Sequence, residues 1–296
     1  MPPITAPTPT APTPGVPPVH PVHVNRPPVM VALDIDGTLT PSGSLDVPGP
    51  TVAAVTAVRR AGHHVVLSSG RSLAGVLPIA HELGIAQGWA VASNGAVIAR
   101  LEPVSETHPH AYALDSGDVR PLDARLVMTT ALSARLPGLM IAVEEIGVGY
   151  YVSETFPDGL LRGEQTMLPV HELAALASPR IILRAPGADY LIGPLRTVGV
   201  TATPAADVGW IDVTGGGVSK ASALETVRKR LRVDPADTIA VGDGINDLPA
   251  LGWAARAVAM GHAPMEVRAA ADEVTGTLEE HGAADVLRSL LPGPID

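Results

Sequence analysis

From residue 29 onward, short apolar runs alternate with longer segments of helical pattern. The apolar runs, dominated by Val, Ala and Leu, lie at positions 29–33, 64–67, 90–93, 238–241 and 257–260. Such runs are typical of strands buried on both faces of a parallel sheet. The intervening segments carry helix signals, such as Pro50 before residues 51–61 and Gly62 after them. The pattern therefore predicts an α/β fold with a doubly wound parallel sheet.

This alternation stops after about residue 104 and resumes about a hundred residues later. In between, the predicted elements are a hairpin around Gly147, helices near 119–136 and 170–177, and a strand at 180–185. We therefore expect an α+β unit at residues 105–205, inserted between core segments 29–104 and 206–292. Because the insertion leaves the core sheet and returns to it, we expect a cap over the strand ends.

Residues 1–28 differ from the rest of the chain in composition. They contain eleven prolines, which preclude a packed helix or a central strand. A continuous apolar stretch after a charged start, the mark of a secretory signal, is missing. We expect a disordered tail biased toward polyproline II, and leave it out of the fold.

Charge and composition narrow the classes of function. The formal net charge is −10 and no block of Lys or Arg stands out, which argues against a nucleic-acid partner. No apolar span is long enough to cross a membrane, and none of the ten histidines belongs to a closed zinc-ligand set. The absence of cysteine excludes disulfides and thiolate chemistry and fits a reducing compartment, so we expect a cytoplasmic protein. Nothing in the sequence indicates the oligomeric state.

The first chemical motif, DIDGT at 34–38, follows the first apolar run. A carboxylate fixed at the end of a strand, Asp34, suits in-line attack on phosphorus. The second carboxylate, Asp36, could protonate the leaving oxygen and later activate water. Gly37 permits a sharp turn that leaves backbone N–H groups facing an anion. An ordinary Asp-rich turn is the alternative for this motif taken alone.

Two further motifs could hold a phosphoryl group. Ser69 and Gly70, in SSGR after the second run, could offer a hydroxyl and backbone N–H groups, although an ordinary helix N-cap fits equally well. Arg71 beside them could be a simple surface cation. Lys220 lies in the first turn of a predicted helix, where the dipole disfavours a cation. An anionic partner, such as a carboxylate or a phosphate, would compensate that misfit, whereas a solvated lysine would tolerate it.

The motif GDGIND at 242–247 supplies further oxygen ligands. Together with Asp34 and the backbone carbonyl of Asp36, Asp243 could complete an oxygen shell for Mg²⁺. Asn246 is also a plausible N-cap of the following helix, and the two roles are compatible. One such metal would neutralise charge during phosphoryl transfer.

These motifs together resemble the haloacid dehalogenase (HAD) superfamily. They match its four motifs in order, with Asp34 and Asp36 as the first, Ser69 as the second, Lys220 as the third, and Asp243 and Asp247 as the fourth. The stretches 93–96, 210–224 and 257–275 resemble those of the Cof-like branch with a class IIB cap. The family usually has Asn where His262 stands, which bears on a loop contact near the site.

The resemblance implies a function for each motif. The resemblance implies that Asp34 is the nucleophile and Asp36 the general acid/base. Mg²⁺ would be bound by Asp34, the Asp36 carbonyl and Asp243. The phosphoryl group would be bound by Ser69, Lys220 and Asn246 with Gly37 and Gly70, and Asp247 would have a positioning role. Arg71 and Asn94 are candidate substrate contacts.

We therefore predict a Mg²⁺-dependent phosphatase that acts on a small phosphorylated metabolite through an aspartyl-phosphate. A dehalogenase would not need the carboxylate of Asp36. Two alternatives stay open: a phosphomutase with the same class of cap, and a catalytically inactive HAD fold used for binding.

Overall fold

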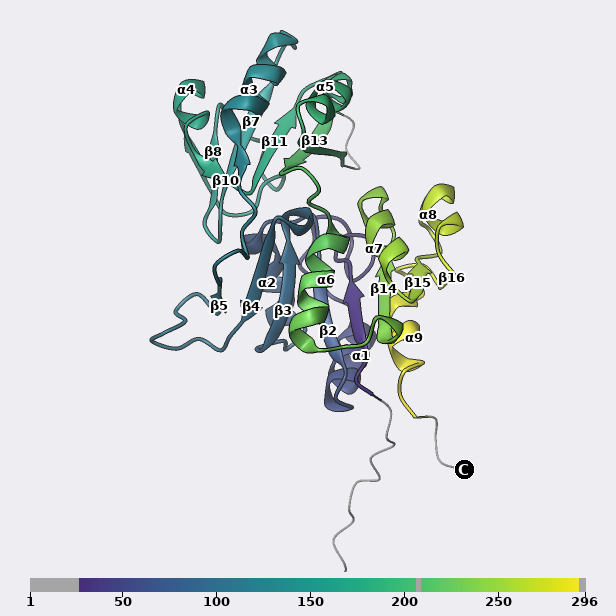
Figure 1. Cartoon of the computed structure of the whole chain (residues 1–296). Coiled ribbons are helices and arrows are strands. Elements are labelled where there is room, and N and C mark those ends of the chain that lie inside the picture. The colour runs from purple at the N-terminus through teal and green to yellow at the C-terminus, as the bar shows by residue number, and fades with distance from the viewer. Residues whose placement is uncertain (1–26, 206–208, 293–296) are drawn as a thin grey trace, which may run out of the picture.

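The computed structural model describes residues 27–205 and 209–292. The predicted disordered tail, residues 1–28, lies outside the described residues except for its last two prolines. Figure 1 shows two packed parts: a larger α/β part built from both ends of the described chain, and a smaller α+β part from its middle.

The larger part is built on an eight-stranded sheet. Its strands, in spatial order, are β16 (Glu273–Val274), β15 (Arg256–Ala259), β14 (Thr238–Gly242), β1 (Met30–Leu33), β2 (His64–Ser68), β3 (Gly88–Ala92), β4 (Val97–Leu101) and β5 (Tyr112–Ala113). The strands from β16 to β3 are parallel, whereas β4 and β5 are antiparallel additions at one edge.

Helices cover both faces of this sheet, which confirms the predicted doubly wound α/β fold. One face packs against α1 (Gly49–Arg60), α2 (Leu73–Glu82) and α9 (Gly282–Arg288), the other against α6 (Lys220–Leu231), α7 (Leu248–Trp253) and α8 (Met265–Ala269). In β1, Val31 and Leu33 face the first layer, and Met30 and Ala32 the second. Burial on both faces explains the unbroken apolar run of this strand. No helix in the described part of the chain is long and apolar enough to span a membrane.

The smaller part is a six-stranded sheet covered by helices on one face. Its strands, in spatial order, are β12 (Thr201–Pro204), β13 (Trp210–Thr214), β11 (Arg180–Arg184), β7 (Met140–Glu145), β8 (Gly149–Val152) and β9 (Glu164–Met167). The covering helices are α3 (Ala124–Ser133), α4 (Val170–Leu173) and α5 (Ile192–Thr197), and β6 (Leu122–Asp123) pairs separately with β10 (Ala177–Ser178). The other face meets loops at the carboxyl ends of β2 and β3 (Figure 1).

The strand pairing differs from the predicted segment boundaries in two places. The predicted core segment 206–292 includes residues 210–214, but these residues form β13, which pairs with β11 and β12 in the smaller sheet. All five residues of β13 are buried, so its sequence resembles that of a core strand. Conversely, residues 112–113, expected in the insertion, pair with β4 in the larger sheet. We propose that the cap extends from β6 to β13.

The turn after β3, Ser93–Gly95, packs tightly against the start of α6. Ser93 and Asn94 have φ angles of 52° and 54°, which non-glycine residues rarely adopt. Gly95 follows with φ of 102°, and a Cβ there would collide with the carbonyl oxygen of Ser219, the residue before α6. Only glycine lets the two segments approach this closely.

We therefore expect Gly95→Ala to destabilise the protein more than a glycine replacement in open space. Gly62 is the matched control, because its φ is 91° and nothing lies within 4 Å of a Cβ placed there. Gly62→Ala should lower the free energy of unfolding by about 1–2 kcal/mol through backbone strain alone. Gly95→Ala should cost about 1–3 kcal/mol more, from overpacking. Equal losses in urea denaturation would show that the Ser219 segment moves aside freely.

Candidate functional site

The predicted motifs meet at one edge of the larger sheet because their strands are neighbours. Asp34 follows β1, SSGR begins at the end of β2, and GDGIND begins at the end of β14. The backbone continues sheet-like pairing past β1, since Asp34 N–H donates to the Val241 carbonyl at 3.0 Å. Carboxyl ends of adjacent parallel strands are where ligands bind in open α/β sheets.

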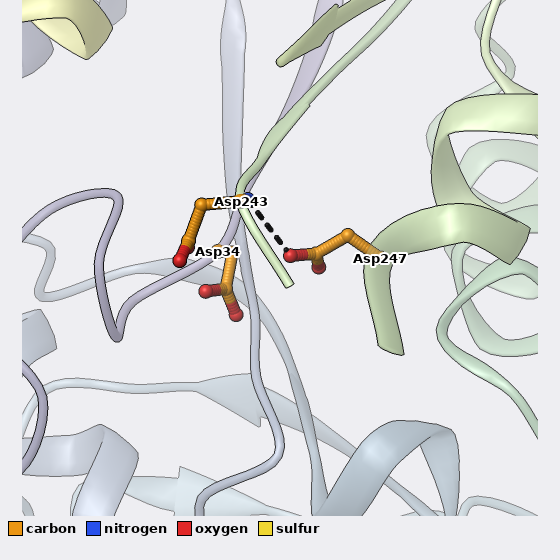
Figure 2. Close-up of side chains that lie close together, drawn as sticks. All are labelled: Asp34, Asp243 and Asp247. Carbon is orange, nitrogen blue, oxygen red and sulfur yellow. Dashed lines mark hydrogen bonds between the residues drawn. The ribbon is translucent and has the colours of Figure 1, made fainter. Parts of the chain in front are cut away.

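Three carboxylates and one ammonium group form the centre of the site. Lys220 Nζ lies 2.5 Å from Asp34 Oδ1 and 2.5 Å from Asp247 Oδ1. Ligand oxygens of Asp34, Asp243 and Asp247 all lie within 4.8 Å of one another. Figure 2 shows Asp34 and Asp243 side by side, while Asp247 approaches from the helix opposite. Lys220 thus has the anionic partner that its position at a helix start predicted.

Both carboxylate oxygens of Asp247 accept hydrogen bonds from the protein. Oδ1 accepts from Lys220, and Oδ2 accepts the backbone N–H groups of Asp243 and Gly244 at 3.1 and 2.9 Å (Figure 2). These hydrogen bonds hold the loop after β14 in place and also orient the side chain of Lys220. Asp34 Oδ2 and Asp243 Oδ2, in contrast, accept no hydrogen bond from the described residues.

Burial and mutual repulsion shape the charges of this cluster. Burial, followed by the charge of Asp247, raises the pKa of Asp34 well above its usual value, although Lys220 opposes the shift. The same two causes raise the pKa of Asp243 to about 6. Burial alone would lower the pKa of Lys220, but Asp247 and Asp34 outweigh it and hold the pKa above its ordinary value. The lysine therefore stays charged, and a second cation nearby would favour ionised carboxylates.

The donor set fits Mg²⁺, which prefers carboxylate and carbonyl oxygens and keeps part of its water. Asp34 Oδ2 and Asp243 Oδ2 are the uncommitted oxygens, and Asp243 Oδ1 is fixed by a 3.0 Å hydrogen bond from Thr38. Gly37 has φ of 80°, and a Cβ there would collide with the Asp243 carboxylate. The residue at position 37 must therefore be glycine for the first and fourth motifs to approach each other.

Asp36, the predicted acid/base, directs its carboxylate toward Arg71 and not toward the acidic cluster. Arg71 donates from Nε and Nη2 to the two carboxylate oxygens at 2.8 and 2.7 Å, and Gly43 N–H adds a third bond at 2.8 Å. Burial acts to raise the pKa of Asp36, but the hydrogen bonds and charge of Arg71 outweigh it, and the pKa is lowered. Arg71 is therefore a buried partner of Asp36 and not a surface cation, and its Nη1 has no hydrogen-bond partner.

The predicted phosphate-binding residues lie in adjoining loops. The hydroxyl of Ser69 is fully buried and accepts the Arg71 N–H at 3.1 Å, so its own proton can still be donated. The helix N-cap alternative is wrong for Ser69, because the N-cap of α2 is Ser72. Asn246 Nδ2 donates to Asn94 Oδ1 at 3.0 Å. Both amides lie against Gly70, where a Cβ would be 3.2 Å from Asn94 Oδ1 and 3.4 Å from Asn246 Nδ2.

Several residues at the site were not singled out from the sequence. Thr38 is one of them, and its hydroxyl donates to Asp243 Oδ1 at 3.0 Å. His262, which the sequence analysis did note, has its Nε2 atom 3.9 Å from Asp243 Oδ2. The smaller sheet contributes Glu144, Arg180 and Asp212, which contact the loops after β2 and β3. Their one sequence signal is a charged residue inside an otherwise apolar strand, as in RIILR and WIDVT.

Because Lys220 offsets two buried carboxylates, we expect Lys220→Met to destabilise the fold by about 3–5 kcal/mol at neutral pH. The loss should shrink on acidification. A carboxyl whose folded pKa is raised contributes stability at low pH that is lost as the pH rises through the folded pKa, here about 6 for Asp243. Urea denaturation above and below that pH measures the effect.

Lys229→Met is the matched control, since Lys229 lies on the same helix with 68% of its side chain exposed. It should change stability little at either pH. If Lys220→Met behaved like this control, the proposed charge balance of the cluster would be wrong.

The chain is similar to known proteins in sequence and in structure. The sequence pattern of haloacid dehalogenase-like hydrolases matches residues 31–120 and 202–287. Phosphatase YwpJ of Bacillus subtilis is 27% identical over 292 residues, 88% of this chain and 99% of that protein. The phosphoglycolate phosphatase of Natronomonas pharaonis is 29% identical over 259 residues, 87% of this chain and 95% of that protein.

Solved structures agree on the fold. A sugar phosphatase of HAD subclass IIB has a TM-score of 0.70 at 20% identity, over 88% of this chain and 98% of its own. A haloacid dehalogenase-like hydrolase from B. subtilis has a TM-score of 0.73 at 22% identity, over 88% of this chain and 99% of its own. The resemblance inferred from the motifs is confirmed, and the match over more than half of the sequence shows that the chain belongs to the haloacid dehalogenase-like hydrolases.

Proposed function

We propose that this protein is a Mg²⁺-dependent phosphatase that hydrolyses a small phosphorylated metabolite through an aspartyl-phosphate on Asp34. One observation carries the proposal: buried Lys220 bridges Asp34 and Asp247, which leaves Asp34 Oδ2 without a hydrogen-bond partner beside Asp243. Curated relatives named as phosphatases, similar over almost their full length, support the reaction class.

In the proposed first step, a carboxylate oxygen of Asp34 attacks phosphorus, the P–O bond to the leaving alcohol breaks, and Asp36 gives the oxygen of that alcohol a proton. In the second step, Asp36 takes a proton from water, whose oxygen attacks phosphorus. The bond between phosphorus and the Asp34 oxygen breaks, which releases inorganic phosphate and leaves Asp34 as a free carboxylate. Asp36 pairs with Arg71 in this structure, so it must exchange that partner to reach the reacting oxygen.

The remaining residues would bind and orient the phosphoryl group. Lys220 faces the nucleophile directly, and Asp247 keeps it there. Ser69, Asn246 and the backbone at Gly37 and Gly70 would donate to phosphoryl oxygens. Mg²⁺ held by Asp34, Asp243 and the Asp36 carbonyl would neutralise charge on the transferred group when bound.

We expect the purified protein to release phosphate from a panel of phosphorylated metabolites and from an aryl phosphate in Mg²⁺, and to lose this activity in EDTA. Asp34→Asn should abolish turnover with the fold intact, because an amide cannot form the phospho-enzyme. Asp285→Asn, on the exposed surface of α9, is the control and should keep full activity.

Turnover retained in pure Asp34→Asn protein would contradict the nucleophile assignment. If the wild type released phosphate from no compound, a mutase assay primed with a sugar bisphosphate would come next. Formation of product in that assay would contradict the proposal of a phosphatase and support the phosphomutase alternative.

We also expect Asp36→Ala to slow both formation and hydrolysis of the phospho-enzyme, each by about 10²–10⁴-fold, the usual contribution of a positioned acid/base. Rapid-quench single-turnover experiments separate the two steps. If only one step slowed, Asp36 would act as acid or as base but not as both.

A further inference from the structure

A small cavity lies in the larger part, between the acidic cluster and the apolar layer under α7. Its volume is about 10 Å³, close to the smallest space that holds one water molecule. Three polar residues line it: Asp34, Asp247 and Ser68. The cavity therefore connects Ser68, at the end of β2, with the two carboxylates that bind Lys220.

Strand register explains why Ser68 faces the same space as Asp34. Ala32 of β1 pairs with Val66 of β2, and both residues pack in the layer that contains α6 and α7. Side chains two residues apart on a strand lie on the same face. Asp34 and Ser68 are two residues beyond this pair, so both are directed toward α6 and α7, where Lys220 and Asp247 lie.

Small side chains around this point leave room for a cavity. Ala32, Ala240 of β14 and Ala250 of α7 line it, and their methyl groups are too short to fill the space between the sheet and the helix. Gly242 lets Asp247 lie close to β14, because a Cβ there would collide with the Asp247 carboxylate. The cavity thus has polar as well as apolar walls, whereas cavities that stay dry have apolar walls alone.

The hydroxyl of Ser68 is a second and independent observation that points to a bound molecule. Ser68 is only 2% exposed, and its Oγ has no hydrogen-bond partner among the described residues. Buried hydroxyl groups are nearly always paired with protein or with ordered water, because burial without a partner is costly. A water molecule in the cavity that Ser68 lines would supply the partner.

The two carboxylates can accept further hydrogen bonds. Asp34 Oδ1 and Asp247 Oδ1 each accept one bond, in both cases from Lys220. A carboxylate oxygen offers two acceptor sites, so each of these oxygens keeps one. A water that accepts the Ser68 proton can donate its own two protons to the two carboxylates. It would then have three partners, the usual number for a buried water.

We propose that this cavity binds one ordered water molecule, and that Ser68 is a positioning residue that acts on the nucleophile through it. The Ser68 hydroxyl donates to the water, and the water donates to Asp34 and Asp247. Among the described residues, Lys220 is the one side chain that donates to the Asp34 carboxylate. A second donor restricts rotation of the carboxylate that attacks phosphorus. This effect on catalysis rests on the proposed phosphatase activity, whereas binding of the water does not.

A crystal structure of the wild-type protein tests the water site directly. We expect one water molecule at about 2.7–3.2 Å from Ser68 Oγ and from carboxylate oxygens of Asp34 and Asp247. Ser68→Val should lack this water, because valine fills the space and has no donor. Ser72→Ala is the matched control and should keep it, since Ser72 is also buried in this loop but does not line the cavity. A wild-type structure without the water would overturn the proposal.

Hydrolysis of 4-nitrophenyl phosphate in Mg²⁺ tests the positioning role. Ser68→Ala removes the hydroxyl but keeps the space, and Ser68→Val removes both. We expect kcat to fall about tenfold or more in each, because a small displacement of a reacting group slows the chemical step. Affinity for inorganic phosphate, measured as product inhibition, should be unchanged, and Ser72→Ala should keep the wild-type kcat. A loss of phosphate affinity as large as the loss of kcat would show a disturbed phosphate loop and overturn the positioning role.

The outcomes separate this inference from the proposed function. No turnover of 4-nitrophenyl phosphate by the wild type would contradict the phosphatase activity, and the crystal structure would still decide whether the water binds. An ordered water together with a wild-type kcat in both Ser68 variants would overturn the positioning role and leave the phosphatase activity standing.

Discussion

The buried ammonium group of Lys220 is the contact on which the geometry of the site depends. It begins α6, where the helix dipole disfavours a cation, and it is almost completely removed from water. Both penalties are offset by carboxylates of Asp34 and Asp247, each 2.5 Å away. Because these three residues come from three separate segments, the contact ties β1, α6 and the start of α7 together. Without it, neighbouring carboxylates would repel one another across the ends of β1 and β14.

Burial of these carboxylates makes the site costly to fold, and the surrounding sheet compensates for that cost. Burial, followed by the charge of Asp247, raises the pKa values of Asp34 and Asp243, which means that these carboxyl groups bind their protons more tightly in the folded state than in water. The strands beneath are buried on both faces by aliphatic side chains. Apolar burial in the sheet therefore holds charges at its edge in an arrangement that they would not adopt by themselves.

The parallel core and most of the site could be predicted from the sequence, because both depend on local signals. Short apolar runs specify buried strands, and polar residues at the ends of β1, β2 and β14 must meet once these strands are neighbours. The sequence did not predict that Asp36 would pair with Arg71, since that contact depends on how two loops fold over each other. The assignment of β13 to the core was wrong for a different reason. Its five buried residues are as typical of a strand in the larger sheet as of one in the smaller sheet.

The contacts that charged residues of the smaller sheet make with the core could not be predicted from the sequence. Glu144, Arg180 and Asp212 share a face only because of strand register between segments far apart in the chain. Buried charges need partners, and Ser93 and Asn94 of the core provide two of them from a turn with strained backbone angles. Directional hydrogen bonds therefore help to hold the smaller part against the core. Since the same loops are predicted to bind the phosphoryl group, we expect substrate binding to be coupled to the contacts between the smaller part and the core.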